Sequence, residues 1–270
     1  MPRMLTEPQV AQYHDKGYVF PFRALDAADA AATLRKIEAF EARMGDEAQK
    51  FLAFKSHLPF KWLSDIIRHP RILDAVEDIL GQNLLCWGSS FFQKNAHDPR
   101  YISWHQDSYY YGMQPSNTCT AWLAITPSNA LSGAVRVIPG SHVEQVEFVN
   151  APDANNLLPR GQTIRNVDES KAVLMKLDPG EFSLHHEGIV HNSDPNNADY
   201  RRIGISIHYV PTGTRMVKYL KDGEKPMAAL VRGVDEHGYW THEPVTEMDF
   251  DPAMFDTLTR MRREFLTRAR

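Results

Sequence analysis

The chain has 270 residues, of which 43% are hydrophobic and 24% charged, a composition typical of globular proteins and not of disordered or fibrous ones. Its 30 basic and 34 acidic residues give a net charge of −4 with neutral histidines. Because neutralising phosphates requires a basic surface, this balance argues against nucleic acid as a main partner.

The first 82 residues are predicted to be mostly helical. Thr6, Pro8 and Gln9 are typical of a helix start, since threonine caps, proline is tolerated in the first turn, and Gln9 completes a capping box. This helix should end at Gly17, and residues 18–22 favour a strand. Three further helices are expected at residues 27–44, 62–67 and 72–80, with a break between the last two at Pro70 and an end at Gly81.

From residue 84 onward the pattern changes to short β-branched or aromatic runs separated by Gly, Pro, Asn and Asp. The predicted strands cover residues 84–87, 91–94, 118–125, 134–138, 172–177, 181–184 and 203–210. Such spacing is typical of an all-β sandwich or barrel. Neither an alternating strand–helix pattern nor a glycine-rich phosphate loop is visible, which disfavours a nucleotide-binding fold.

We therefore expect one domain over residues 1–270, mainly β with flanking helices (α+β). A helical part at about 1–82 should pack on a β core at about 83–211. The extension 212–270 combines polar loops with a basic helix at about 252–268.

His105 and Asp107 form the most informative pair in the sequence. In a strand, residues i and i+2 face the same side, so the imidazole and carboxylate would lie next to each other as two ligands of one metal. Residues 184–193 contain three histidines and a glutamate as candidates for a third ligand. Two histidines and one carboxylate make the facial triad of non-haem Fe(II) oxygenases. The alternative is that these histidines are hydrogen-bonded structural residues.

The run that begins at Arg202 predicts a strand with two different faces. Arg202, Gly204, Ser206 and His208 share one face, and the isoleucines at 203, 205 and 207 share the other. The isoleucine face should pack in an apolar core, which turns the guanidinium toward a polar interior. A buried arginine needs an anion, and its fork suits a carboxylate. The alternative is that Arg201 and Arg202 form surface ion pairs.

Three motifs in this order resemble the phytanoyl-CoA dioxygenase family. They are His105-x-Asp107, the stretch GAVRVIPGSH at residues 133–142, and HNSDPN at residues 191–196 followed by Arg202. The opening residues 5–18 are also similar, and the resemblance extends to about residue 211. It implies a double-stranded β-helix core, of the jelly-roll or cupin-like kind, and an Fe(II)- and 2-oxoglutarate-dependent dioxygenase.

The resemblance also implies roles for individual residues. His105, Asp107 and His191 correspond to the iron ligands, and Arg202 to the partner of the distal carboxylate of 2-oxoglutarate. Trp122 stands where family members place a tryptophan against the cosubstrate, although a core aromatic would fit the same position. Ser206, on the face of the arginine, is expected to add a hydroxyl to the cosubstrate site.

Substrate contacts are predicted at Phe91, Gln93, Tyr109 and His186. Phe91 and Gln93 lie on the strand before the His-x-Asp motif, and Tyr109 opens a run of three tyrosines directly after it. Consecutive residues of an extended chain alternate faces, so only some of these tyrosines can point inward. His186 precedes His191 by five residues and is expected to line the pocket without binding the metal.

The implied reaction is hydroxylation, or another oxidation such as desaturation or demethylation, of an unactivated C–H bond. A small soluble metabolite would be oxidised at the expense of 2-oxoglutarate and O2, with release of succinate and CO2. Halogenation is disfavoured, because related halogenases have a small residue where this chain has Asp107. The alternatives are a jelly-roll metal-binding protein with incidental histidines and a non-oxygenase metalloenzyme, an isomerase or hydrolase, which would not need Arg202.

Location in the cytoplasm is the expectation from the remaining signals. No run of 18 apolar residues suggests a membrane span, and the N-terminal residues are charged throughout, unlike a secretory signal. Cys86 and Cys119 are too few for a disulfide framework and lack zinc-site spacing. The sequence predicts no oligomeric state.

Overall fold

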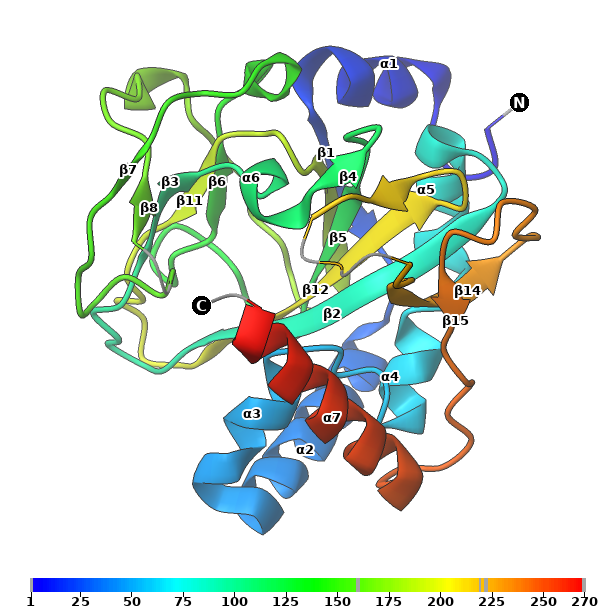
Figure 1. Ribbon diagram of the computed structural model, residues 1–270. Coiled ribbons are helices and arrows are strands. Elements are labelled where there is room, and N and C mark those ends of the chain that lie inside the picture. Colours follow the sequence, from blue (N-terminus) through cyan, green and yellow to red (C-terminus); the bar gives the residue numbers. More distant parts are fainter. Residues whose placement is uncertain (1, 159–160, 219, 221–222, 269–270) are drawn as a thin grey trace.

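The computed structural model describes residues 2–158, 161–218, 220 and 223–268, with side chains described as far as Arg263. Its strands form two main sheets, and most of its helices gather on one side of the long strand β2 (Figure 1). No helix within these ranges is long and apolar enough to cross a membrane.

The larger sheet has seven strands in the order β1 (Tyr18–Arg23), β10 (Glu181–His186), β5 (Cys119–Ala124), β12 (Arg202–Pro211), β2 (Leu84–Lys94), β14 (Met227–Arg232) and β15 (Thr241–His242). The smaller sheet has four, in the order β3 (Ile102–His105), β11 (His191–Ser193), β6 (Val135–Val137) and β9 (Val173–Leu174). Two short pairs join β13 (Arg215–Met216) to β4 (Met113–Gln114) and β7 (Val149–Asn150) to β8 (Gln162–Thr163). All strand pairs are antiparallel except β14 with β15.

The helices are α1 (Glu7–Lys16), α2 (Ala27–Met44), α3 (Ala48–Leu52), α4 (Lys61–Ile66), α5 (Pro70–Leu80), α6 (Ser108–Tyr111) and α7 (Pro252–Arg268), with 3-10 turns at Gly45–Glu47, Ser141–Val143 and Glu169–Lys171. Figure 1 shows α2, α3, α4 and α7 together below β2, with α1 at the opposite end of the molecule. Phe255 of α7 packs edge-on against Phe51 of α3, with ring centroids 4.8 Å apart. The C-terminal helix is therefore part of the helical layer.

The predicted helix signals in the first part of the chain are confirmed. Thr6 caps α1, its backbone N–H donates to the Gln9 side chain at 2.8 Å, and Gly17 ends the helix at φ +82°. The helix predicted at residues 27–44 has those bounds. Pro70 begins α5 as its first residue, where the missing N–H costs nothing. The short helix α3 was not predicted.

The two strands predicted at residues 84–87 and 91–94 are one continuous strand, β2. It pairs with β12 from Arg202↔Lys94 to Pro211↔Leu84, with one irregularity near His208. The small residues Gly88–Ser90, which resemble a loop in sequence, stay extended because β12 supplies hydrogen-bond partners along this stretch. The prediction of a mainly β chain with flanking helices is confirmed.

The two faces of β12 separate as predicted. Ile203, Ile205 and Ile207 are fully buried in the main hydrophobic cluster, together with residues of the helical layer such as Phe40. Burying each isoleucine is worth about 1.5–3 kcal/mol, which determines the direction in which this strand faces. Arg202 therefore points toward the smaller sheet. The expectation that residues 1–270 form a single domain stays a prediction.

Candidate active site

Three possible metal ligands meet at the edge of the smaller sheet. Ligand atoms of His105, Asp107 and His191 all lie within 4.8 Å of one another, and no other such group occurs among the described residues. His105 ends β3 and His191 begins β11, and the two residues are directly paired across the sheet. The His105 Nε2 atom is 3.3 Å from Asp107 Oδ1, and the two imidazole centroids are 4.1 Å apart. The structure thus brings together the three predicted ligands.

The predicted strand geometry of this motif is wrong. β3 ends at His105, and Asp107 lies in a turn that begins α6, where its carbonyl accepts from the N–H of Tyr110 at 2.9 Å. The partner strand β11 starts at His191, opposite His105, so no ladder continues to Asp107. The carboxylate reaches the histidines because the chain folds back, and not because the two residues share a strand face.

Backbone carbonyls orient both imidazoles. Nδ1 of His105 donates to the Ser103 carbonyl at 2.8 Å, and Nδ1 of His191 donates to the Ile189 carbonyl at 2.9 Å. A carbonyl only accepts, so each Nδ1 carries the proton and each Nε2 presents its lone pair. Two such nitrogens and one carboxylate are the donor set of the facial triad that binds Fe(II). These residues therefore fit a non-haem iron.

The ligands are held in the protonation states that a metal requires. Burial and the neighbouring His105 lower the pKa of His191 to about 4, so its imidazole is neutral at pH 7. Burial alone would raise the pKa of Asp107, but the neighbouring imidazoles of His105 and His191 hold it well below its usual range. No proton has to leave these two groups before a cation binds at neutral pH.

Tyr111 hydrogen-bonds the carboxylate from α6. Its hydroxyl donates to Asp107 Oδ2 at 2.7 Å, which leaves Oδ1 toward the histidines. Burial and the charge of Asp107 raise the pKa of Tyr111 well above its usual value, so the phenol stays a donor. The residue predicted to face the site is Tyr109, whereas Tyr111 reaches it, because residues 108–111 form a helical turn and not an extended chain.

Arg202 is buried with room for an anion. It is 1% exposed, its Nη2 donates to Ser193 Oγ at 2.7 Å, and its Nε is buried without a hydrogen-bond partner. Within the described part of the chain no carboxylate lies within ion-pair distance of Arg202. Burial lowers its pKa to about 10, so it remains charged at pH 7. A buried guanidinium with an orphaned N–H is costly unless an anionic ligand completes it.

The surface ion pair considered for this region belongs to Arg201. Its guanidinium donates to both carboxylate oxygens of Glu41 on α2, at 2.8 and 2.9 Å. Adjacent strand residues face opposite sides of a sheet, so Arg201 points to the helical layer and Arg202 to the interior. The two arginines are therefore a natural matched pair for mutation.

A second buried basic side chain lies behind Arg202. Lys94 is fully buried on β2, and its ammonium donates to Ser193 Oγ at 2.6 Å, to the Ser193 carbonyl at 3.0 Å, and to the Asp194 carbonyl. Burial and the charge of Arg202 lower the pKa of Lys94 to about 6. Ser193 thus receives hydrogen bonds from Arg202 and Lys94 and fixes their positions. An anion bound at Arg202 would offset the guanidinium charge that lowers the pKa of Lys94.

Trp122 and Ser206 complete a cavity of about 80 Å³ that also contains the three metal-ligand candidates and Arg202. Trp122, on β5, pairs with Ser206 on β12, and its ring centroid lies 5.4 Å from the Arg202 guanidinium carbon. A Cβ at Gly204 would overlap the Trp122 ring, so only glycine allows this close approach. These positions agree with those predicted for the cosubstrate residues.

Two predicted substrate residues face away from the cavity. Phe91 packs in the main hydrophobic cluster, with its ring centroid 6.3 Å from that of Trp62, and Gln93 accepts from Arg201. The pairing of Lys94 with Arg202 places the even-numbered residues of this half of β2 on the cavity side. Phe92, between the two predicted residues, lines the cavity instead. An error of one residue along a strand reverses the face.

The other two predicted substrate residues also lie outside the cavity. Tyr109 packs edge-on against Phe148, with ring centroids 4.3 Å apart. His186 accepts from the Gly188 N–H at 3.0 Å and lies beside His142. His185 takes the inward position, with its ring 5.3 Å from that of His191. Side chains alternate between the two faces of β10, so knowing which face of this strand points inward would have selected His185 over His186.

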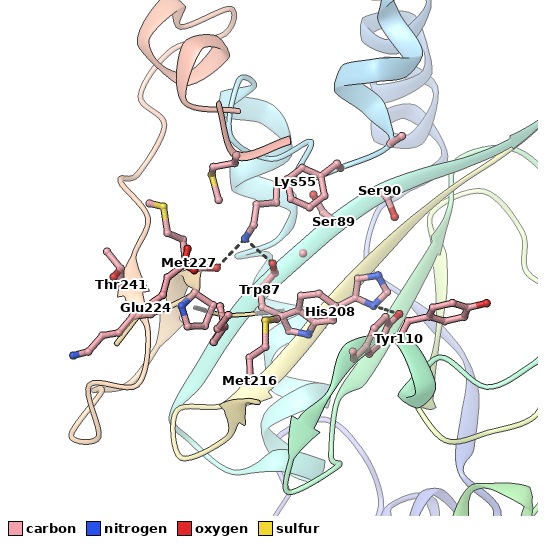
Figure 2. A pocket seen from close by; sticks show the side chains of 18 residues that line it. Lys55, Trp87, Ser89, Ser90, Tyr110, His208, Met216, Glu224, Met227 and Thr241 are labelled. Carbon is pink, nitrogen blue, oxygen red and sulfur yellow. Dashed lines mark hydrogen bonds between the residues drawn. The ribbon is translucent and has the colours of Figure 1, made fainter. Parts of the chain in front are cut away.

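A larger cavity of about 450 Å³ opens beside this site. Tyr111 and His208 line both cavities. Figure 2 shows His208 and Tyr110 at one side of the larger cavity and Thr241 and Glu224 at the other. His208 Nδ1 lies 3.0 Å from Thr120 Oγ1 and 3.4 Å from the Tyr111 hydroxyl. The larger cavity therefore adjoins the smaller one that contains the triad.

Metal-free protein is expected to lose stability between pH 7 and pH 5. Burial, reinforced by His191, lowers the pKa of His185 to about 3, and burial lowers that of His208 to about 4, whereas unfolded histidine titrates near 6.5. The unfolded chain then binds protons that the folded chain cannot, so stability present above about pH 6.5 is lost below it. Each imidazole should cost about 2 kcal/mol of unfolding free energy at pH 5 relative to pH 7.

Urea unfolding of the metal-free protein at the two pH values measures this loss. The variant His185→Asn should show a smaller pH dependence, whereas His97→Asn, at an exposed histidine, should match the unmodified chain. An unfolding midpoint that is the same at pH 7 and pH 5 would contradict the assignment of neutral buried histidines.

Comparison with known proteins adds to this geometry. The family model described as phytanoyl-CoA dioxygenase matches residues 13–204. A probable alpha-ketoglutarate-dependent hypophosphite dioxygenase of Stutzerimonas stutzeri is 25% identical over 228 residues, which cover 74% of this chain and 77% of the relative. A 1-deoxypentalenic acid 11-beta-hydroxylase of Streptomyces exfoliatus is 26% identical over 188 residues, covering 64% and 62%.

Solved structures are similar over nearly the whole chain. The non-heme monooxygenase ThoJ is 30% identical and superimposes with a TM-score of 0.83, covering 97% of this chain and 98% of ThoJ. CytC3, solved with Fe(II) and alpha-ketoglutarate, is 25% identical with a TM-score of 0.67, covering 93% and 98%. The prediction of a jelly-roll core is confirmed by this similarity.

Proposed function

The chain belongs to the phytanoyl-CoA dioxygenase family, and from this membership we propose which residues carry out its reaction. The protein is an Fe(II)- and 2-oxoglutarate-dependent oxygenase that uses O2 and acts on a small molecule. The observation that carries the residue assignment is the convergence of three ligand atoms within 4.8 Å beside a buried arginine that has no carboxylate partner among the described residues. Cytoplasmic location and single-domain organisation stay predictions.

His105, Asp107 and His191 are the residues that would hold the iron. Carbonyl oxygens of Ser103 and Ile189 fix the two imidazoles with Nε2 inward. The Tyr111 hydroxyl holds Asp107 by Oδ2, which limits the rotation of the carboxylate. Orienting groups of this kind tune metal affinity by about 10–100-fold.

Arg202 would hold the distal carboxylate of 2-oxoglutarate. Its unpartnered Nε and its Nη2 offer two donors in a fork that matches a carboxylate. Ser206, four residues further along β12 on the same face, would add a hydroxyl, and Trp122 would cover the carbon chain. Lys94 and Ser193 keep the guanidinium in place from behind.

When bound, the iron and 2-oxoglutarate supply the oxidation of a substrate C–H bond, with release of succinate and CO2. The chain's own contribution is to bind, to orient and to exclude water. The buried face of β12 and the ring of Trp122 exclude water around Arg202, and Tyr111 keeps its proton beside Asp107. Hydroxylation is the proposed outcome, because the Asp107 carboxylate occupies the ligand position that a bound halide would need.

Anaerobic titration of the Fe(II)-loaded protein with 2-oxoglutarate tests the proposal. A visible metal-to-ligand charge-transfer band that saturates with one equivalent, followed by succinate release on admission of O2, is the expected result. An isomerase or hydrolase on the same fold would show neither. Absence of both signals from metal-replete protein would overturn the assignment.

A further inference from the structure

Eight of the eighteen residues that line the larger cavity are aromatic, His208 included, or contain sulfur. Trp87 lies at its centre, where its ring stacks on His208 with centroids 5.2 Å apart and meets Tyr111 edge-on at 4.6 Å. Met216 and Met227 extend this surface away from the metal site (Figure 2). Such rings favour flat apolar groups, and methionines adapt to their shape.

Lys55, one of two lysines in the lining of this cavity, is already neutralised. The Lys55 ammonium is bound to Glu243 Oε1 and donates to the carbonyls of Trp87 at 2.6 Å and Met227 at 2.9 Å (Figure 2). His57 takes the other Glu243 oxygen at 2.8 Å, so that carboxylate is satisfied as well. Lys55 therefore anchors the wall and offers no free charge to a ligand.

The remaining charges of the cavity lie at the end away from the metal site. Glu224 and its neighbour Lys225 carry opposite charges, and Figure 2 places Glu224 with Thr241 on the side opposite His208. At the inner end burial keeps His208 neutral. The part of the cavity nearest to the metal site has no net charge, so an ionised group there would lose hydration without a partner.

One polar group of the cavity is unsatisfied. The indole N–H of Trp87 is shielded from water and finds no acceptor among the described residues. A buried donor without a partner costs about 1–3 kcal/mol, and an oxygen acceptor on a bound molecule would remove this cost once the Trp87 ring turns its N–H to the cavity surface. The donor therefore indicates a substrate that carries a carbonyl, ether or hydroxyl oxygen.

The outer wall of the cavity comes from the segment after the family region. The family model ends at residue 204, whereas Met216, Met227, Thr241 and Met261 all lie beyond it. These wall residues therefore lie outside the region that the family model describes. The volume of about 450 Å³ corresponds to about fifteen waters of bulk liquid, well above the size of a simple oxyanion.

We propose that the cavity between Trp87 and the C-terminal methionines binds an uncharged, largely apolar ring compound that presents one oxygen acceptor to the Trp87 N–H. The inference rests on the proposed function, since it takes this cavity as the entrance to the metal site. It excludes small anions and acyl-CoA thioesters as occupants, because their charged groups would find no partner at the inner end.

Binding of matched probes to metal-free protein tests this inference by calorimetry. The probes are 2-acetylnaphthalene, which is neutral with one acceptor, 2-methylnaphthalene, which lacks the acceptor, 2-naphthoate, which is charged, and methylphosphonate, a small anion. We expect 2-acetylnaphthalene to bind saturably and 2-naphthoate at least about tenfold more weakly, because its carboxylate is desolvated without a partner. Methylphosphonate should not compete with either.

Variants locate the binding site. Met261→Glu places a carboxylate in the cavity wall and should weaken the binding of 2-acetylnaphthalene at least about tenfold. Met248→Glu changes a side chain that is 57% exposed and lies outside the cavity, and it should leave this binding unchanged. Trp87→Phe keeps a ring but removes the donor. This substitution should weaken the binding of 2-acetylnaphthalene about fivefold and leave the binding of 2-methylnaphthalene unchanged.

Three results would overturn the inference: 2-naphthoate binding as tightly as the ketone, no saturable binding of any aromatic probe, or equal losses for Met261→Glu and Met248→Glu. A loss in Trp87→Phe that is the same with and without the acceptor would overturn the role of the indole N–H. The charge-transfer titration with 2-oxoglutarate on the same preparation reports on the proposed function separately. If that band forms but none of the aromatic probes binds, the inferred substrate class is wrong and the proposed function stands.

Discussion

Replacing Asp107 with alanine is expected to reduce succinate release by at least about a thousandfold. Asp107 supplies the one anionic donor of the triad, and its loss leaves two neutral imidazoles and an unpaired Tyr111 hydroxyl. Removing groups that merely orient a ligand already costs about 10–100-fold in metal affinity, so removal of a ligand should cost more. Mn(II) affinity by calorimetry and succinate release with Fe(II) measure the two consequences separately.

Asp199→Ala provides the matched control, because Asp199 is an exposed aspartate that pairs only with the exposed His97 among the described residues. It should behave like the unmodified chain in both measurements. The more conservative Tyr111→Phe retains the three ligands and removes only the hydrogen bond to Oδ2, so a partial loss of metal affinity is expected. Succinate release by Asp107→Ala at the unmodified rate would remove Asp107 from the ligand set.

Replacing Arg202 with leucine is expected to raise the dissociation constant for 2-oxoglutarate by at least about a hundredfold. A buried hydrogen-bonded charge pair that loses one partner costs about 2–5 kcal/mol, which corresponds to about 30- to 5000-fold. Anaerobic titration of the charge-transfer band measures the dissociation constant directly.

Arg201→Leu is the internal control for this variant. The two arginines are adjacent, yet Arg201 binds Glu41 and Gln93 in the helical layer and Arg202 faces the cavity. Arg201→Leu should leave the dissociation constant for 2-oxoglutarate within about twofold, with a modest loss of stability as for a half-exposed ion pair. Equal effects of the two substitutions would show that the guanidinium of Arg202 has no special role.

Local signals in the sequence were sufficient to predict the helices in the first part of the chain. The capping box at Thr6 and Gln9, the alanine-rich run of α2 and Pro70 at the start of α5 all act through contacts within a few residues. The isoleucines of β12 were equally readable, because alternation of apolar and polar residues sets the faces of a strand. From these the fold class and the inward position of Arg202 followed.

Positions that depend on partner strands were predicted less well. The strand that contains His105 ends because its partner strand β11 begins opposite this residue. The chain then forms a helical turn, which directs Asp107 and Tyr111 toward the site. Phe92 and His185 face inward in place of Phe91 and His186, since the register of β2 and β10 is set by distant neighbours. Nothing within a few residues of these positions carries that information.

The sequence by itself determined the helical start of the chain, the mainly β core, and, through spacing and residue type, the four side chains that meet in one cavity and that we propose hold the metal and the cosubstrate. Only the tertiary structure decided which neighbouring residues face that site, and that the C-terminal segment forms the wall of the larger cavity. The physical reason is the range of the interactions. Caps, turns and alternation act over a few residues, whereas cavity walls form where strands distant in sequence pair in a particular register.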